Sequence, residues 1–65
     1  MRLRTIPEAA AFIKARDPET YVSEWMLRKL TKQKKIPAVN YGNKYLIDLD
    51  RLEADLAALA GGEAP

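Results

Sequence analysis

The chain has 65 residues, of which 48% are hydrophobic and 31% charged, a balance typical of a folded globular protein rather than a disordered segment. It contains no cysteine and no histidine, which excludes disulfides and thiolate or imidazole zinc sites, so packing alone must stabilise a small core. No apolar run is long enough to span a membrane, and no signal-peptide core follows the first residues, so we expect a cytoplasmic protein.

The formal net charge of +2 is unevenly distributed along the chain. Residues 1–47 contain ten Lys and Arg against four Asp and Glu, a net +6, whereas residues 48–65 contain one against five, a net −4. This asymmetry predicts one basic and one acidic surface. A polyanion is the natural partner of the basic one.

Residues 5–16 are predicted to form the first helix. Thr5 can cap it, Pro7 suits its first turn, and Glu8 can close a capping box. Proline disfavours a helical conformation in the residue before it, so Pro18 ends the helix at Asp17. The apolar residues that repeat at helical spacing, with Phe12 at the edge of their stripe, are Ile6, Ala9, Ala10 and Ile13.

Residues 24–34 are predicted to form a second helix capped by Ser23, because this stretch contains neither glycine nor proline. At 100° per residue, one face of this helix is expected to pack and the opposite face to be free. The packed face comprises Ser23, Met26, Leu27 and Leu30. The free face comprises Trp25, Arg28, Lys29 and Lys32.

A β-hairpin is predicted next, with strands at residues 36–40 and 44–47 around the turn 41–43. Alternation along the second strand directs Tyr45 and Ile47 toward the core. Asp48 or Asp50 then caps a third helix. The apolar stripe of that helix is Leu49, Leu52, Leu56 and Leu59.

Gly61 and Gly62 are expected to stop the third helix, with residues 63–65 frayed. We therefore expect one domain over residues 1–60 and a flexible tail over residues 61–65. The fold class is α+β and mainly helical. Its order of helix, basic helix, hairpin and helix is that of a winged helix-turn-helix, in which the second helix enters the DNA major groove and the hairpin is the wing.

Five positive charges crowd into residues 28–35 with no intervening acid: Arg28, Lys29, Lys32, Lys34 and Lys35. Like charges one turn apart destabilise a helix, and DNA phosphates would neutralise them, although a merely solvated face is the alternative. Trp25 packs either on the first helix or hairpin, or on a sugar, base or partner protein.

The turn residues Gly42, Asn43 and Lys44 offer donors for phosphate or minor-groove contact, unless this is an ordinary exposed turn. The candidate DNA-binding residues are thus Trp25, Arg28, Lys29, Lys32, Lys34, Lys35, Gly42, Asn43 and Lys44.

The chain from Thr5 to Leu56 resembles the excisionase family of phages and conjugative transposons, within the MerR-like winged-helix group. The family pattern is a short strand, a Thr-Ile-x-Glu-Ala-Ala start, a basic helix, an Ile-Pro-Ala-Val segment, a Gly-Asn/Arg-Lys/Arg wing and a Leu-rich helix. The residues of this chain that match it are Thr5-Ile6-Pro7-Glu8-Ala9-Ala10, Leu27-Arg28-Lys29-Leu30, Ile36-Pro37-Ala38-Val39 and Gly42-Asn43-Lys44. The connection over residues 16–21 is longer than in the commoner members.

This resemblance implies that the second helix reads the major groove of double-stranded DNA while the wing contacts the flanking backbone or minor groove. It also implies that the protein bends attachment-site DNA, so that a tyrosine integrase excises a mobile element or prophage rather than integrating it. Simple repressors and activators share this fold, so a small transcription regulator of a phage or mobile element is the first alternative.

No enzyme is expected, because the sequence has no histidine, cysteine, glycine-rich phosphate loop or carboxylate pair on an apolar background. No metal or cofactor is expected either. A second alternative is a protein-interaction module that uses Trp25 and the leucine-rich helix. Without the long coiled-coil helix of full-length MerR regulators, we expect a monomer in solution that assembles cooperatively on DNA.

Overall fold

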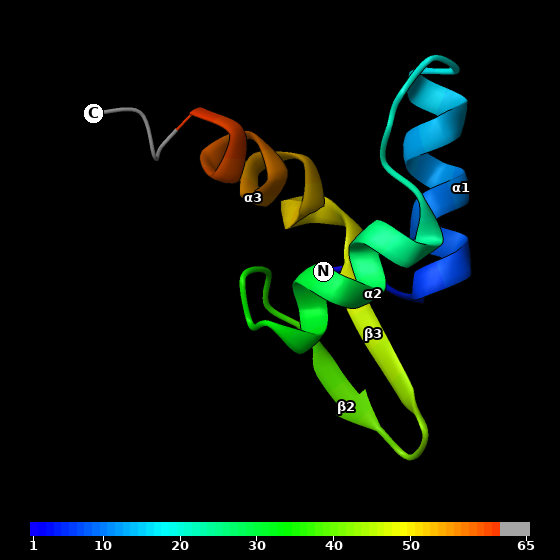
Figure 1. The fold of residues 1–65 in the computed structure, drawn as a ribbon. Coiled ribbons are helices and arrows are strands. Elements are labelled where there is room, and N and C mark those ends of the chain that lie inside the picture. The colour runs from blue at the N-terminus through cyan, green and yellow to red at the C-terminus, as the bar shows by residue number, and fades with distance from the viewer. Residues whose placement is uncertain (62–65) are drawn as a thin grey trace.

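The structure, a computed structural model, describes residues 1–61, which form three helices and a three-stranded antiparallel sheet (Figure 1). In chain order the elements are β1 (Leu3–Thr5), α1 (Ile6–Arg16), α2 (Glu24–Lys32), β2 (Val39–Tyr41), β3 (Lys44–Asp48) and α3 (Leu49–Gly61). The expected α+β class and the expected order of helices and hairpin are confirmed. Gly61 is the last residue of α3, so the helix extends one residue into the predicted tail, and the rest of that tail, residues 62–65, lies outside the described residues.

Helix α1 begins and ends where the sequence predicts. The Thr5 backbone amide donates to Glu8 Oε1 at 3.0 Å, and the Glu8 amide donates to Thr5 Oγ1 at 3.4 Å, which completes the capping box. Asp17 terminates the helix with its amide bonded to the Ile13 carbonyl. The expected apolar stripe is buried: Ile6, Ala9, Ala10 and Ile13.

Helix α2 begins as expected but ends two residues early. Ser23 Oγ accepts from the Met26 amide at 3.2 Å, whereas the last helical residue is Lys32 and not Lys34. Lys34 has a φ of 60°, and the Lys35 amide returns to the Leu30 carbonyl at 2.9 Å. This is a left-handed helix end of the kind that glycine or asparagine usually marks, and neither residue occurs there to reveal it in the sequence.

The sheet has the order β1-β3-β2, so β3 is its central strand. Residue patterns did not assign strand β1, and only the family resemblance included a short first strand. Its conformation comes from pairing with β3, where Thr5 lies opposite Leu46 and Leu3 opposite Asp48. Strand β2 begins at Val39 rather than at residue 36, which shortens the predicted strand.

The core lies between α1, α2, the sheet and the start of α3. Its largest fully buried side chains are Leu27, Ile47 and Leu52. Ile47 thus confirms the predicted inward alternation of β3, and Tyr45 is partly buried against the same core. On α2 the predicted packed face needs correction, because Leu30 and Met26 are only partly buried and Ser23 is exposed. Thr31, which the periodicity does not assign to that face, is buried.

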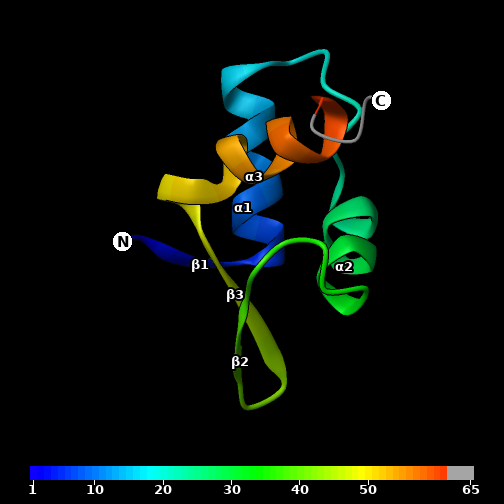
Figure 2. The same ribbon diagram turned by 90° about the vertical axis from the view of Figure 1, so that its left-hand side faces the viewer.

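The second half of α3 packs less closely than its first half. Leu49 and Leu52 are buried, whereas Leu56 and Leu59 are only partly buried. In Figures 1 and 2 this end of the helix extends beyond the sheet, and it lines an apolar groove together with residues of α2. Within residues 1–61 no helix combines the length and apolar character needed to cross a bilayer.

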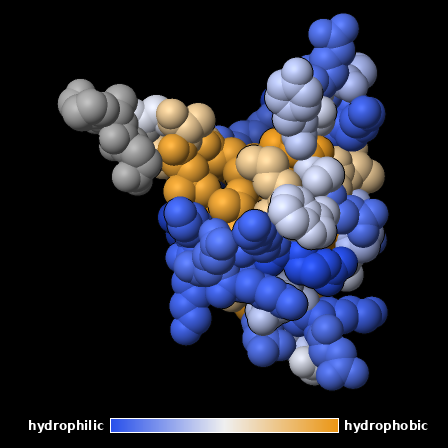
Figure 3. Space-filling model, in the orientation of Figure 1, coloured by the Kyte–Doolittle hydropathy of each residue, from blue (hydrophilic) through white to orange (hydrophobic). Residues whose placement is uncertain are grey.

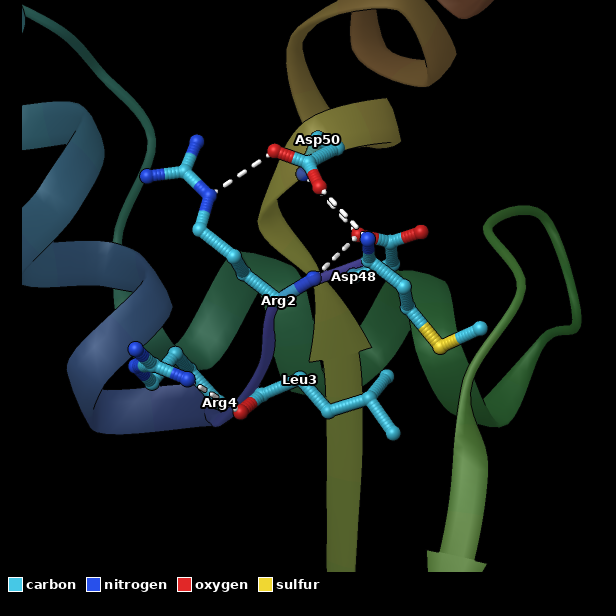
Figure 4. A network of polar contacts seen from close by, with 6 residues as sticks. Arg2, Leu3, Arg4, Asp48 and Asp50 are labelled. Atoms are coloured by element: carbon cyan, nitrogen blue, oxygen red, sulfur yellow. Dashed lines mark hydrogen bonds and ion pairs between the residues drawn. The ribbon is translucent and has the colours of Figure 1, made fainter.

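Polar contacts fasten β1 to the start of α3 (Figure 4). Asp48 Oδ1 accepts from the Asp50 amide at 3.0 Å and from the Arg2 amide at 3.1 Å, so Asp48 is the residue that caps α3. Asp50 instead receives the Arg2 guanidinium, with Nε 2.8 Å from Oδ1. Of the two predicted cap residues, Asp48 therefore caps α3, whereas Asp50 forms an ion pair with Arg2.

Candidate nucleic-acid interface

The exposed face of α2 carries the basic side chains that the helical periodicity placed there. Trp25, Arg28, Lys29 and Lys32 together line a shallow hollow on this face. The Trp25 side chain is 69% exposed, and Lys29 Nζ lies 4.8 Å from the centre of its ring. The indole therefore does not close over α1 or the hairpin, and its contact with the ammonium is a cation–π interaction on the surface.

Ion pairs neutralise three of the four arginines outside α2, while Arg4 bonds only the Leu3 carbonyl in the described part of the chain. Arg16 Nε lies 2.7 Å from Glu53 Oε2, and Arg51 lies 3.5 Å from Asp55. Asp50 accepts both Arg2 and the terminal ammonium of Met1, the latter at 3.0 Å. The acidic residues of α3 thus cancel much of the positive charge of β1, α1 and α3 itself.

The basic residues of α2 and the hairpin have no such partners. Within residues 1–61, none of the following side chains forms an ion pair: Arg28, Lys29, Lys32, Lys34, Lys35 and Lys44. Glu24, the one acid on α2, stands in its first turn, where the helix dipole favours a negative charge. In Figure 3 the hydrophilic surface covers the region of α2 and the hairpin below it. The tertiary structure therefore leaves a surface of uncompensated positive charge.

Lys34 and Lys35 lie beyond the end of α2 rather than on it. Lys34 lines a groove of about 470 Å³ between the end of α2 and the base of the hairpin. The residues lining this groove, which we call the α2–hairpin groove, are Thr31, Lys32, Lys34, Ile36, Pro37, Ala38, Asn40 and Tyr45. The groove thus joins two parts of the predicted interface.

The hairpin turn is tighter than expected. Tyr41 pairs with Lys44, so only Gly42 and Asn43 form the turn. Gly42 has a φ of 61° while Asn43 has no positive φ, which is the pattern of a type II′ turn with glycine at its first central position. In Figures 1 and 2 this turn projects away from the helices, and Gly42, Asn43 and Lys44 are exposed on it.

The charge of the hairpin reaches the start of α1. The pKa of Glu8 is lowered chiefly by the hydrogen bond from the Thr5 amide and also by the Thr5 hydroxyl, with smaller contributions from Arg4 and Lys44. The exposed basic surface of α2 and the hairpin thus presents the ammonium groups of its lysines, the guanidinium of Arg28 and the amide of Asn43. Within the described chain no group of three or more His, Cys, Asp or Glu is positioned to hold a metal ion.

Sequence reasoning missed three polar residues of the groove: Thr31, Asn40 and Tyr45. Thr31 follows Leu27 by four residues and so shares its helical face, a signal that the apolar pattern obscured. Asn40 lies directly opposite Tyr45 in the hairpin. A two-residue turn would have predicted that pairing, whereas the expected longer turn did not.

Comparison of the chain with protein-family models, with curated proteins and with solved structures finds no significant match. The resemblance to excisionases therefore stays a prediction from the sequence.

Proposed function

We propose that this protein binds double-stranded DNA as a winged helix-turn-helix domain and has no catalytic activity of its own. Helix α2 is then the recognition helix, and the β2–β3 hairpin is the wing. The observation that carries the proposal is the separation of charge, in which α3 pairs with Arg2 and Arg16 while the six basic residues of α2 and the hairpin have no ion-pair partner within residues 1–61. Such a surface matches the electrostatic footprint of a phosphate backbone.

Each part of the proposed interface has a distinct task. Arg28 on the exposed face of α2 can bond bidentately to guanine in the major groove, which gives base specificity. Lys29 and Lys32 neutralise phosphates on either side. Trp25, exposed beside Lys29, offers an indole for contact with sugar or base. The turn at Gly42 and Asn43 brings Lys44 to the flanking backbone or minor groove.

The family resemblance favours an excisionase that directs a tyrosine integrase toward excision, with a small transcription regulator as the alternative. Both roles use the same DNA surface, so they differ in what else is required. An excisionase stimulates excision of a substrate carrying attachment sites only when the integrase is present. A regulator represses or activates a promoter without it.

One observation favours a protein-interaction module instead. An apolar groove of about 420 Å³ separates α2 from the second half of α3, and Figure 3 shows an apolar patch over this region. Its lining residues are Val22, Met26, Leu30, Leu56, Ala57, Leu59 and Ala60. A partner bound there would be held by apolar contacts, and its affinity would depend little on salt.

The salt dependence of DNA binding separates these functions. With about four to six phosphate contacts, the slope of log K against log salt concentration for duplex DNA is expected to be about −4 to −5. Arg28→Ala is expected to weaken a specific site by about 1–3 kcal/mol. Lys14→Ala, which removes an exposed charge on α1 outside the proposed surface, serves as the matched control and should bind as the unchanged protein does. A flat slope would contradict the DNA-binding proposal and favour the interaction module.

A further inference from the structure

The α2–hairpin groove collects polar side chains that have no partners in the protein. Neither the Asn40 amide nor the Tyr45 hydroxyl forms a side-chain hydrogen bond within residues 1–61, and Lys32 and Lys34 form no ion pair there. All four line the same groove, which contains no Asp or Glu. The groove therefore carries unneutralised positive charge beside the apolar residues Ile36, Pro37 and Ala38.

Thr31 adds a buried donor to this groove. Its side chain is 5% exposed, and Oγ1 is a buried polar atom without a hydrogen-bond partner in the described chain. Buried hydroxyls are nearly always hydrogen-bonded, because leaving one unpaired costs free energy. Thr31 lines the groove, and a small rotation that exposes Oγ1 would let a ligand or a ligand-bound water supply the missing partner.

Both edges of the groove are positioned by backbone structure. The left-handed conformation of Lys34 turns the chain out of α2 and carries this residue to one side of the groove. On the other side, Asn40 and Tyr45 face each other across β2 and β3 and so extend from the same face of the sheet. Residues from the end of α2, from the turn after it and from both strands of the hairpin thus line one groove.

We propose that the α2–hairpin groove binds a single phosphate group of the DNA backbone. The phosphate is neutralised by Lys32 and Lys34 and accepts hydrogen bonds from the Asn40 amide and the Tyr45 hydroxyl, with Thr31 at the wall of the groove. The proposal rests on the DNA-binding function above and deepens it, because it adds three neutral groups that charge patterning does not reveal. A phosphate bound here would fix the orientation of α2 relative to the wing on the duplex.

Two substitutions remove hydroxyls from the groove without changing any charge, Thr31→Val and Tyr45→Phe, and Thr31→Ser retains the hydroxyl as a matched control. We expect the first two to weaken binding of a mixed-sequence duplex of about 15 base pairs by about threefold to tenfold, the range for losing one hydrogen bond of ordinary strength. The salt slope should stay that of the unchanged protein, since no ammonium is lost. Thr31→Ser should bind within about twofold of the unchanged protein.

Melting temperatures measured on the same variants separate binding from folding. Thr31→Val removes an unpaired buried hydroxyl while keeping a similar shape, so we expect it to melt at or above the temperature of the unchanged protein. Higher stability combined with weaker DNA binding is the signature of a group held for a ligand. Tyr45→Phe tests the opposite wall independently.

The outcomes distinguish the groove from the wider function. If Thr31→Val and Tyr45→Phe bind the duplex like the unchanged protein, and the unchanged protein keeps its steep salt slope, the groove proposal is wrong and DNA binding stands. If the unchanged protein does not bind the duplex, both fail. An amide NMR titration with inorganic phosphate provides the third measurement. Shifts at groove residues with phosphate but not with duplex would identify a small-anion site and overturn the proposal.

Discussion

Lys34 occupies a backbone conformation that its side chain makes unfavourable. Its φ of 60° lies in the left-handed region, where a residue with a Cβ is strained by about 1–2 kcal/mol and glycine is not. Strain of this kind is retained where surrounding structure or function requires the residue. The Lys34 ammonium lines the α2–hairpin groove, so its charge provides a reason for lysine at this position.

Lys34→Gly is therefore expected to change stability and DNA binding in opposite directions. Relief of strain, reduced by the greater freedom of glycine in the unfolded chain, should raise the free energy of unfolding by about 0.5–1 kcal/mol. Loss of one phosphate contact should lower the salt slope by about one unit. Urea unfolding and duplex titration measure the two effects. Lys35→Gly is the control, because it loses the same charge without relieving a positive φ and should lower stability.

A stabilised Lys34→Gly protein that bound duplex DNA with undiminished affinity and salt slope would contradict this assignment. The left-handed lysine would then serve only to end α2, and Lys34 would not belong to the DNA-binding surface.

At the scale of elements, the junction of β1 with α3 depends on two aspartates with different roles. Asp48 caps α3, and Asp50 pairs with the Met1 ammonium and with Arg2. The hydrogen bond from the terminal ammonium, followed by that from Arg2, lowers the pKa of Asp50 below its ordinary value of 3.8. The three-residue strand β1 is thus held at its free end by charge as well as by pairing with β3.

This lowered pKa predicts an acid-sensitive contribution to stability. Because the folded pKa lies below the unfolded one, the contribution is fully present above pH 3.8 and is lost as the pH falls through the lowered pKa. The melting temperature should therefore decline as the pH falls below about 3.8, and less steeply in Asp50→Asn. The difference should be small, since exposed ion pairs stabilise little. Identical pH profiles for the two proteins would show that this pairing has no thermodynamic effect.

At the scale of the whole molecule, three elements depend on one leucine. Leu27 of α2 is fully buried in the core with Ile47 of β3 and Leu52 of α3. Removing such a side chain costs about 2–5 kcal/mol. A domain of this size has a total stability of about 3–5 kcal/mol.

Leu27→Ala should consequently leave a large fraction of the protein unfolded at room temperature, as measured by circular dichroism and thermal melting. Leu30→Ala, at a partly buried position on the same helix, should remain folded with a lower melting temperature. Equal destabilisation by both substitutions would contradict the burial seen here and restore the position of Leu30 predicted from periodicity.

The sequence by itself determined the local structure of this protein. The capping box at Thr5 and Glu8 and the Ser23 cap each act through hydrogen bonds within a few residues, so they could be read without a fold. The buried stripe of α1 and the inward position of Ile47 followed from helical and strand periodicity. The same periodicity placed Trp25, Arg28, Lys29 and Lys32 together on one face of α2.

Only the tertiary structure decided the remaining features, because each depends on residues far apart in the chain. Strand β1 forms because it pairs with β3, for example Leu3 with Asp48, and these paired residues are more than forty positions apart in the sequence. The separation of charge depends on contacts such as Arg16 with Glu53, which no local pattern contains. The early end of α2 and the groove joining Thr31 to Tyr45 likewise arise where the end of a helix meets a hairpin. Local hydrogen bonds and periodicity are encoded within one or two turns, whereas pairing partners and compensating charges are chosen by the packing of the whole chain.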